Sequence, residues 1–140
     1  AVAGGSAARR AAGRSFLVLS QACWSCQRAV LFDSWILIKT YHDGLKDYPE
    51  LMLFNSESDP HEQRNLAESE PERVKEGLAI LKDWENEMIR TSHTKEDPML
   101  GVIREGGPFH ARLDRLQEYV DYYRSIGRED IAERMVRRYR

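Results

Sequence analysis

The residues best suited to chemistry in this sequence are Cys23 and Cys26, which are separated by Trp24 and Ser25. Cys-x-x-Cys pairs occur in thiol–disulfide oxidoreductases, where a following helix lowers the pKa of one thiol. Here the next residues read Gln-Arg-Ala-Val-Leu-Phe, which favours a strand rather than a helix. The pair is also half of a zinc site, but no second Cys or His pair stands at ligand spacing. We interpret both cysteines as structural, with a small thiol–disulfide protein as an alternative.

The chain contains four histidines, of which His42 is the best candidate for a functional residue; the others are His61, His93 and His110. No two of them are three or four residues apart, so the spacing predicts no metal cluster on a helix face. His42 lies between Tyr41 and Asp43 at the end of a predicted strand, where loops often line clefts. Tyr41, His42 and Asp43 are therefore candidate substrate-cleft residues, and a solvated loop histidine is the alternative interpretation.

A catalytic nucleophile is not evident from the motifs. The sequence holds no Gly-x-Ser-x-Gly, no glycine-rich phosphate loop and no recognisable Ser/His/Asp set. Most carboxylates lie on predicted helix faces beside Lys or Arg, which is typical of solvated surface. We predict no catalytic residue and no metal ligand in this chain.

The composition fits one folded domain, with 41% hydrophobic and 31% charged residues and a net charge of −2. Because both signs are interspersed, the charge pattern indicates no nucleic-acid partner. No apolar run approaches the roughly 18 residues of a membrane span, so we expect no membrane partner. The arginines of 134–140 are interpreted as a basic helix end that complements the helix dipole.

The hydrophobic pattern predicts an α+β fold. Short apolar runs predict three or four antiparallel strands, at residues 16–19, 29–32, 35–41 and 51–54. Only Asp33 and Ser34 separate the second and third runs, which is typical of a hairpin. A sheet of this size needs a covering layer on one face.

The second half of the chain predicts that cover. A helix-start pattern with a capping box is formed by Ser69, Pro71 and Glu72. Apolar residues then recur near the helical period, which predicts a long helix over about 70–90. Residues 91–109 show no sustained period and are expected to be a connection. A C-terminal helical pair follows, with Gly127 as the stop between its two apolar stripes. The expected divisions are a mobile tract at 1–14, an α+β unit at 15–109 and a helical tail at 110–140.

The most specific stretch is 51–67, Leu-Met-Leu-Phe-Asn-Ser-Glu-Ser-Asp-Pro-His-Glu-Gln-Arg-Asn-Leu-Ala. Asp59 is a suitable N-cap, Pro60 suits a first helical position, and Glu62 would complete a capping box. Asn65 and Leu66 then close the turn, with Leu66 fixing it to the core. In physical terms the stretch is a strand-to-helix connector.

This stretch resembles the C-terminal signature of sulfatases, enzymes of the alkaline-phosphatase-like superfamily. The signature reads as an aliphatic–aromatic strand followed by Asp-Pro-x-Glu-x-x-Asn-Leu-Ala and a long helix. The resemblance covers roughly residues 16–109 and is similar to bacterial-type and sulfamidase-like members. It implies a small C-terminal subdomain, a four-stranded antiparallel sheet with one long helix, of a hydrolase acting on sulfate esters or sulfamates.

The family's catalytic parts have no counterpart in this sequence. The resemblance implies a formylglycine nucleophile, made in a C/S-x-P-x-R motif, and a calcium ion held by Asp and Asn residues. Neither Cys23 nor Cys26 begins such a motif, and the acidic metal-binding pair is missing. We therefore expect an inactive C-terminal fragment without a cofactor, whose partner is a missing N-terminal catalytic domain. Self-association is also expected, and a non-catalytic interaction module using residues 110–140 is a further alternative.

Overall fold

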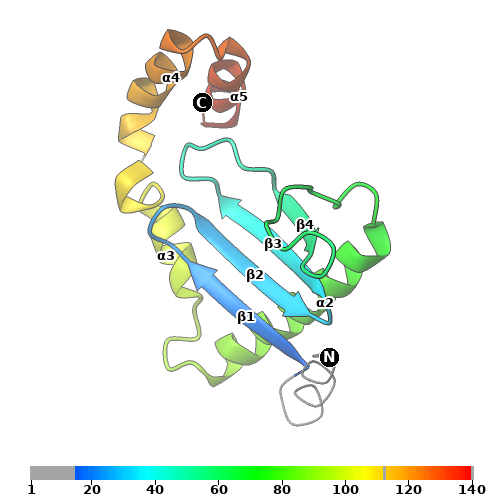
Figure 1. The fold of residues 1–140 in the computed structure, drawn as a ribbon. Coiled ribbons are helices and arrows are strands. Elements are labelled where there is room, and N and C mark those ends of the chain that lie inside the picture. Colours follow the sequence, from blue (N-terminus) through cyan, green and yellow to red (C-terminus); the bar gives the residue numbers. More distant parts are fainter. Residues whose placement is uncertain (1–14, 112, 140) are drawn as a thin grey trace.

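The computed structural model describes residues 15–139 except residue 112. The tract 1–14, for which mobility is expected, lies outside the described residues. The α+β class is confirmed, with an antiparallel sheet, a long covering helix and a C-terminal helical pair (Figure 1).

The sheet contains four antiparallel strands in the order β1-β2-β3-β4. Their bounds are β1 Phe16–Gln21, β2 Cys26–Phe32, β3 Trp35–His42 and β4 Leu51–Asn55. All four predicted strands are present, and the hairpin at Asp33-Ser34 is confirmed because Phe32 pairs directly with Trp35. Asp33 has a φ of +48°, the left-handed conformation that such a two-residue turn requires.

Helix α2, Pro71–Thr91, covers one face of this sheet. Its buried Val74 and Leu81 pack on a core formed by alternate strand residues, namely Val30, Phe32, Leu37 and Leu53. Helix and sheet approach most closely at Gly77, where a Cβ atom would stand 2.7 Å from Leu37 Cδ2 and 2.9 Å from Phe32 Cε1. A side chain at Gly77 would force the two layers apart.

The start of α2 differs in part from the prediction. Pro71 does occupy the first turn, but Glu70 is the cap residue and makes no side-chain cap hydrogen bond. The predicted capping box of Ser69 and Glu72 is wrong, because the Ser69 hydroxyl donates to the Leu66 carbonyl instead. The chain therefore enters the helix from a tight turn at residues 66–70.

The stretch expected to be a connection contains a short helix, α3, Pro98–Arg104. Asp97 caps it by accepting from the Met99 amide at 3.0 Å, and Pro98 fits the first helical position. Its one buried residue is Met99. A helix of seven residues with a single buried position shows no repeat of apolar residues, so it could not be recognised in the sequence.

The C-terminal helices form a second packed unit. Two short 3₁₀ turns, Phe109–Ala111 and Leu113–Arg115, lead into α4, Leu116–Ser125, and α5, Glu129–Tyr139. Gly127 follows α4 with a φ of +77°, as expected of the stop. Both helices share a core with a residue of the loop after β3; its members are Leu45, Ala111, Val120, Ile131, Ala132 and Met135. None of the described helices is long and apolar enough to cross a membrane.

Candidate functional site

A cleft of about 420 Å³ opens where β3 ends and the C-terminal helix returns to the sheet. The predicted residues Tyr41, His42 and Asp43 all line it, so the structure brings this trio into one hollow. The other wall comes from α5, about a hundred residues further along the chain. The complete lining is Lys39, Thr40, Tyr41, His42, Asp43, Tyr48, Glu50, Arg138 and Tyr139.

A β-bulge sets the positions of Tyr41 and His42. Thr40 pairs with Gln27 and His42 with Cys26, so Tyr41 is an extra residue in β3. The Tyr41 hydroxyl donates to Glu85 on α2. Burial and the neighbouring Glu85 carboxylate raise the pKa of Tyr41 well above its usual value. The side chain of Tyr41 thus anchors the strand end beneath α2.

His42 is a buried imidazole with one unused polar atom. The side chain is 8% exposed, and its Nδ1 accepts from the Gly44 amide at 3.0 Å. The proton of the neutral ring is therefore on Nε2, which is buried and has no hydrogen-bond partner within residues 15–111 and 113–139. Burial lowers the pKa of His42; Lys46 and Arg138 add to this, while Asp43 opposes it.

Two contacts fix the His42 ring in place. The ring of Tyr139 lies with its centroid 5.3 Å away. A Cβ atom on Gly107 would stand 2.6 Å from Nε2, so only glycine allows the loop after α3 to approach this closely. His42 is therefore the point where the strand end, the loop after α3 and α5 meet.

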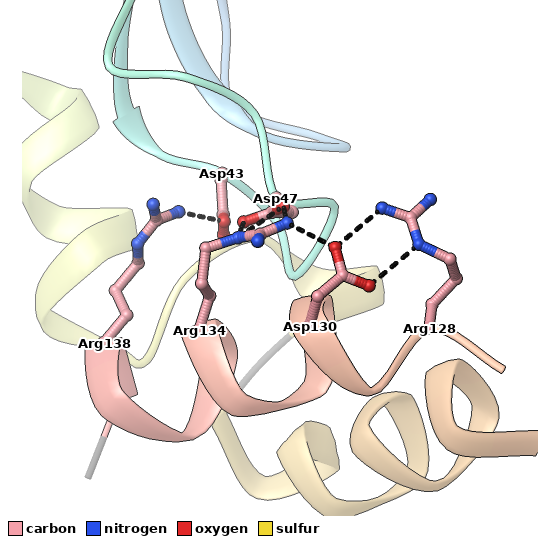
Figure 2. A network of polar contacts seen from close by, with 6 residues as sticks. All are labelled: Asp43, Asp47, Arg128, Asp130, Arg134 and Arg138. Atoms are coloured by element: carbon pink, nitrogen blue, oxygen red, sulfur yellow. Dashed lines mark hydrogen bonds and ion pairs between the residues drawn. The ribbon is translucent and has the colours of Figure 1, made fainter.

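Asp43 joins the strand end to α5. Its carboxylate is almost fully buried and accepts from the Leu45 amide, the Arg138 guanidinium and the Tyr139 hydroxyl. Beside it Arg134 binds Asp47 at 2.6 Å (Figure 2). The interpretation of the C-terminal arginines as a simple helix end is incomplete, because two of them pair with loop carboxylates. Those partners are over 85 residues away in the sequence, so local patterns could not reveal them.

A second polar cluster, which sequence reasoning missed, centres on Arg28 in β2. Its guanidinium binds Asp97 through two parallel hydrogen bonds of 2.6 and 2.7 Å and Glu85 at 2.7 Å. Burial alone lowers the pKa of Arg28, but the hydrogen bonds to Asp97 and Glu85 outweigh it and raise the pKa above its usual value. The hydrogen bond from Arg28 also lowers the pKa of Asp97 below its usual value, so Asp97 stays charged.

The Arg28 cluster borders a groove of about 500 Å³ between the sheet, the end of α2 and α3. Trp84, Met88 and Met99 give this groove a mostly apolar lining. Both carboxylates and the guanidinium are engaged with one another, so they hold α2 and α3 to the sheet. We assign this cluster a structural role.

The cysteine pair shows a geometry unlike that of an oxidoreductase. Cys23 is exposed, Cys26 is buried, and the two thiols are not joined by a disulfide. Cys26 begins β2, and burial raises its pKa rather than lowering it. A raised pKa reduces the thiolate fraction that attacks a disulfide.

The residues of the 51–67 signature build a turn rather than a helix start. Asp59 accepts from the amides of Gln63 and Arg64, but no helix begins here, so it closes a turn and is not the predicted N-cap. Glu62 has a φ of +52°, which is not helical, so the predicted capping box with Glu62 is wrong and Pro60 lies in a turn.

Asn65 connects the signature to the edge strand β4 through its side chain. Its Oδ1 accepts from the amides of Leu53 and Ala67, and its Nδ2 donates to the Leu51 carbonyl. The Leu66 amide bonds to the Leu53 carbonyl, and the Leu66 side chain packs on the core beneath α2, as predicted. The signature therefore fastens the segment before α2 along the edge strand β4.

Three further residues give the cleft a cation, an anion and an aromatic ring. Lys39 provides a cation; it is half-buried, with its ammonium 4.8 Å from the Tyr41 ring centroid. Glu50 provides an exposed carboxylate, and Tyr48 provides an exposed aromatic ring. Among residues 15–111 and 113–139 no group of three or more His, Cys, Asp or Glu side chains is placed to hold a metal ion.

Solved structures include chains that are similar in fold to part of this one, and one of them is given below. No protein-family model matches the chain, and no curated protein matches it. The solved structure is of a Bacteroides thetaiotaomicron protein, described as a 6S-sulf protein of a core genetic locus for the metabolism of multiple glycosaminoglycans. It is 20% identical, with a TM-score of 0.43, over 53% of this chain. The matched part covers 17% of that chain, so this chain spans only a small part of its length.

Proposed function

We propose that this chain is the C-terminal subdomain of a sulfatase-type hydrolase. In this proposal another domain supplies the formylglycine nucleophile and the calcium ligands, and this chain completes the enzyme without doing bond-breaking chemistry itself. The observation that carries the proposal is the 51–67 stretch. Two of its signature residues make backbone hydrogen bonds: Asp59 closes the turn through the Gln63 amide, and Asn65 joins the segment before α2 to the edge strand β4 through the Leu53 amide.

The proposed contribution of this subdomain to the reaction is one wall of the substrate cleft. His42 and Asp43 hold the wall rigid from within, while Lys39 and Tyr48 are the groups placed to meet a sulfated substrate. A cation beside an aromatic ring suits a negatively charged sugar or aryl sulfate. The proposed role is therefore to position the substrate, and it requires no acid, base or nucleophile from this chain.

The DNA upstream of the Ala1 codon tests the proposal most cheaply. We expect a reading frame there, in the same gene or directly adjacent, that encodes a domain with the C/S-x-P-x-R motif. An upstream region without such a motif would remove the proposed function.

The cleft itself is tested in the longer polypeptide that such a frame encodes. Lys39→Met should lower kcat/KM for a sulfated substrate mainly through KM, because the change removes ground-state binding to the anion. His42→Asn should do the same, with circular dichroism as a check of folding, because it loosens the wall. His61→Asn, at an exposed turn position, is the matched control. If Lys39→Met and His42→Asn both had the kinetics of the wild type and of the His61→Asn control, the cleft assignment would be withdrawn.

A further inference from the structure

The groove of about 500 Å³ beside the Arg28 cluster, here called the α2–α3 groove, has no part in the proposed function. Its walls come from the end of β1, the second half of α2 and the helix α3 (Figure 1). A hollow of this volume lies within the range that small-molecule sites occupy. Its hydrocarbon surface comes from six side chains, which are Ala22, Trp84, Met88, Ile89, Met99 and Val102. The α2–α3 groove therefore has the size and the apolar walls of a ligand site.

The charges that line the α2–α3 groove are not balanced. Among the described residues that line it, Arg28 is the one cation. The carboxylates of the lining are Glu85, Glu96 and Asp97, so negative charges exceed positive charges by two. Arg28 is also occupied, because its guanidinium donates to Ser20 as well as to Glu85 and Asp97. An anionic ligand would therefore meet carboxylates in the described lining and find its cation already engaged.

Two of these carboxylates keep an oxygen that a ligand can reach. The Glu85 side chain is 21% exposed, and its Oε1 accepts from both Arg28 and Tyr41. Its Oε2 makes no hydrogen bond with any other described residue. Glu96 is exposed, and its ion pair with Arg104 is 3.7 Å long, which is too long for a hydrogen bond. An ammonium group placed here would form charge-assisted hydrogen bonds with both carboxylates.

The apolar walls determine what the rest of the ligand must be. Trp84 offers a flat ring surface, and the thioether side chains of Met88 and Met99 adapt to irregular shapes. A cation without a hydrocarbon part would gain nothing from these walls, because burying apolar surface is the term that they contribute. The matching ligand therefore has an aromatic or branched aliphatic body and one ammonium group at its end.

We propose that the α2–α3 groove binds a small amphipathic amine, with its hydrocarbon body against Trp84 and Met99 and its ammonium at Glu85 and Glu96. This site is distinct from the substrate cleft, since the two hollows share no lining residue. The inference does not rest on the proposed function, and it can be tested on the 140-residue chain itself.

Titration of the isotope-labelled chain with naphthylethylamine, followed by NMR, tests the site. The chain has three tryptophans, and of these Trp84 lines the groove while Trp24 and Trp35 do not. The indole N–H signal of Trp84 should therefore shift, and the other two indole signals should stay in place. A molecule of about 13 heavy atoms at ordinary ligand efficiency gives a Kd of roughly 1 mM or below.

Two probes of the same shape separate the charge from the hydrocarbon. Naphthylethanol should bind about tenfold more weakly than the amine, because it cannot make a charge-assisted hydrogen bond to Glu85. Naphthylacetate should bind more weakly still, because its carboxylate meets like charges. An alcohol that binds as tightly as the amine would overturn the proposal, and so would an amine that leaves the Trp84 signal in place.

Three glutamate variants test where the ammonium lies. Glu85→Gln should weaken amine binding about tenfold and leave alcohol binding unchanged. Glu96→Gln, at an exposed position where the fold is not at risk, should weaken amine binding about threefold. Glu87→Gln is the matched control, because Glu87 is an exposed glutamate of α2 outside the groove lining, and it should bind the amine as the wild type does.

The NMR spectrum of each variant also shows whether its fold is kept, which matters because Glu85 binds Arg28. Unchanged amine affinity in Glu96→Gln and in a folded Glu85→Gln would overturn the proposal. If Glu85→Gln did not fold, unchanged amine affinity in Glu96→Gln alone would overturn it.

Discussion

The Arg28 cluster and the Asp43 cluster both hold a helix to the sheet through a buried charge, yet they are built in opposite ways. Arg28 is a buried cation between two carboxylates, Glu85 and Asp97, which are themselves largely shielded from water. Asp43 is a buried anion whose cationic partner, Arg138, is 43% exposed. All three charged groups of the first cluster are largely shielded from water, while the cation of the second is in contact with it. We infer that α2 and α3 are held firmly to the sheet, whereas the attachment of α5 at the cleft is more easily loosened.

The largest effect is expected from Arg28→Met. Removing the cation leaves the carboxylates of Glu85 and Asp97 facing each other in a shielded site, which should lower the free energy of unfolding by about 3–5 kcal/mol. Urea unfolding followed by tryptophan fluorescence measures it, with the exposed Arg90→Met on α2 as control. If Arg28→Met were as stable as Arg90→Met, the Arg28 cluster would not be what holds α2 and α3 to the sheet.

A smaller loss is expected from Asp43→Asn. The change removes the charge that binds Arg138 but keeps an oxygen for the Leu45 amide, and Arg138 can return to water, so about 2 kcal/mol is expected. Asp130→Asn, at an exposed site that also binds arginines, is the matched control. Amide exchange should show the loss in α5, at Ala132 and Met135, before it shows in the sheet. A uniform loss across both regions would contradict the separation of the two clusters.

The smallest effect is a pH dependence confined to the Asp43 side. Because the pKa of His42 is lowered on folding, the unfolded chain binds more protons below its ordinary value of about 6.5. The free energy of unfolding should therefore fall as the pH drops below about 6.5, by at most about 1.4 kcal/mol per pH unit. Asp97 also has a lowered pKa, so its stabilising contribution is lost only as the pH falls below about 4.

Urea unfolding at pH 7 and pH 5.5 measures this difference, with His42→Asn as the comparison. The variant should lose the fall in stability between the two pH values, and exposed His61→Asn should keep it. A wild-type protein equally stable at both pH values would show that His42 is not held neutral by its buried site.

The sequence predicted the elements well and the links between them poorly. The strands at 29–32 and 35–41, joined by Asp33-Ser34, could be predicted because strand alternation and turn preference depend on residues close together in the sequence. Helix α2 could be predicted because its apolar residues recur at the helical period over most of its 21 residues. By contrast the Arg28–Asp97 and Asp43–Arg138 pairs join residues 69 and 95 positions apart, and nothing in a local window reports such partners.

The candidate site was found in part for the same reason. Tyr41, His42 and Asp43 were identifiable from their place at a strand end, and the structure gathers them around one cleft. Tyr139 lies in the C-terminal helix α5, and its contact with His42 becomes visible only once the C-terminal helices are folded onto the sheet. The Glu62 capping box failed because the Asp-Pro turn closes through Gln63 and Arg64 and puts Glu62 in a left-handed conformation.

The proposed function makes this chain the part of a hydrolase that holds and completes the site but carries out no bond cleavage. Hydrolysis of 4-nitrophenyl sulfate by the purified 140-residue chain, with and without a chelator, measures it most directly. The account predicts no release of 4-nitrophenol above the buffer rate under either condition. Turnover by the chain that stops when the chelator is added would contradict it.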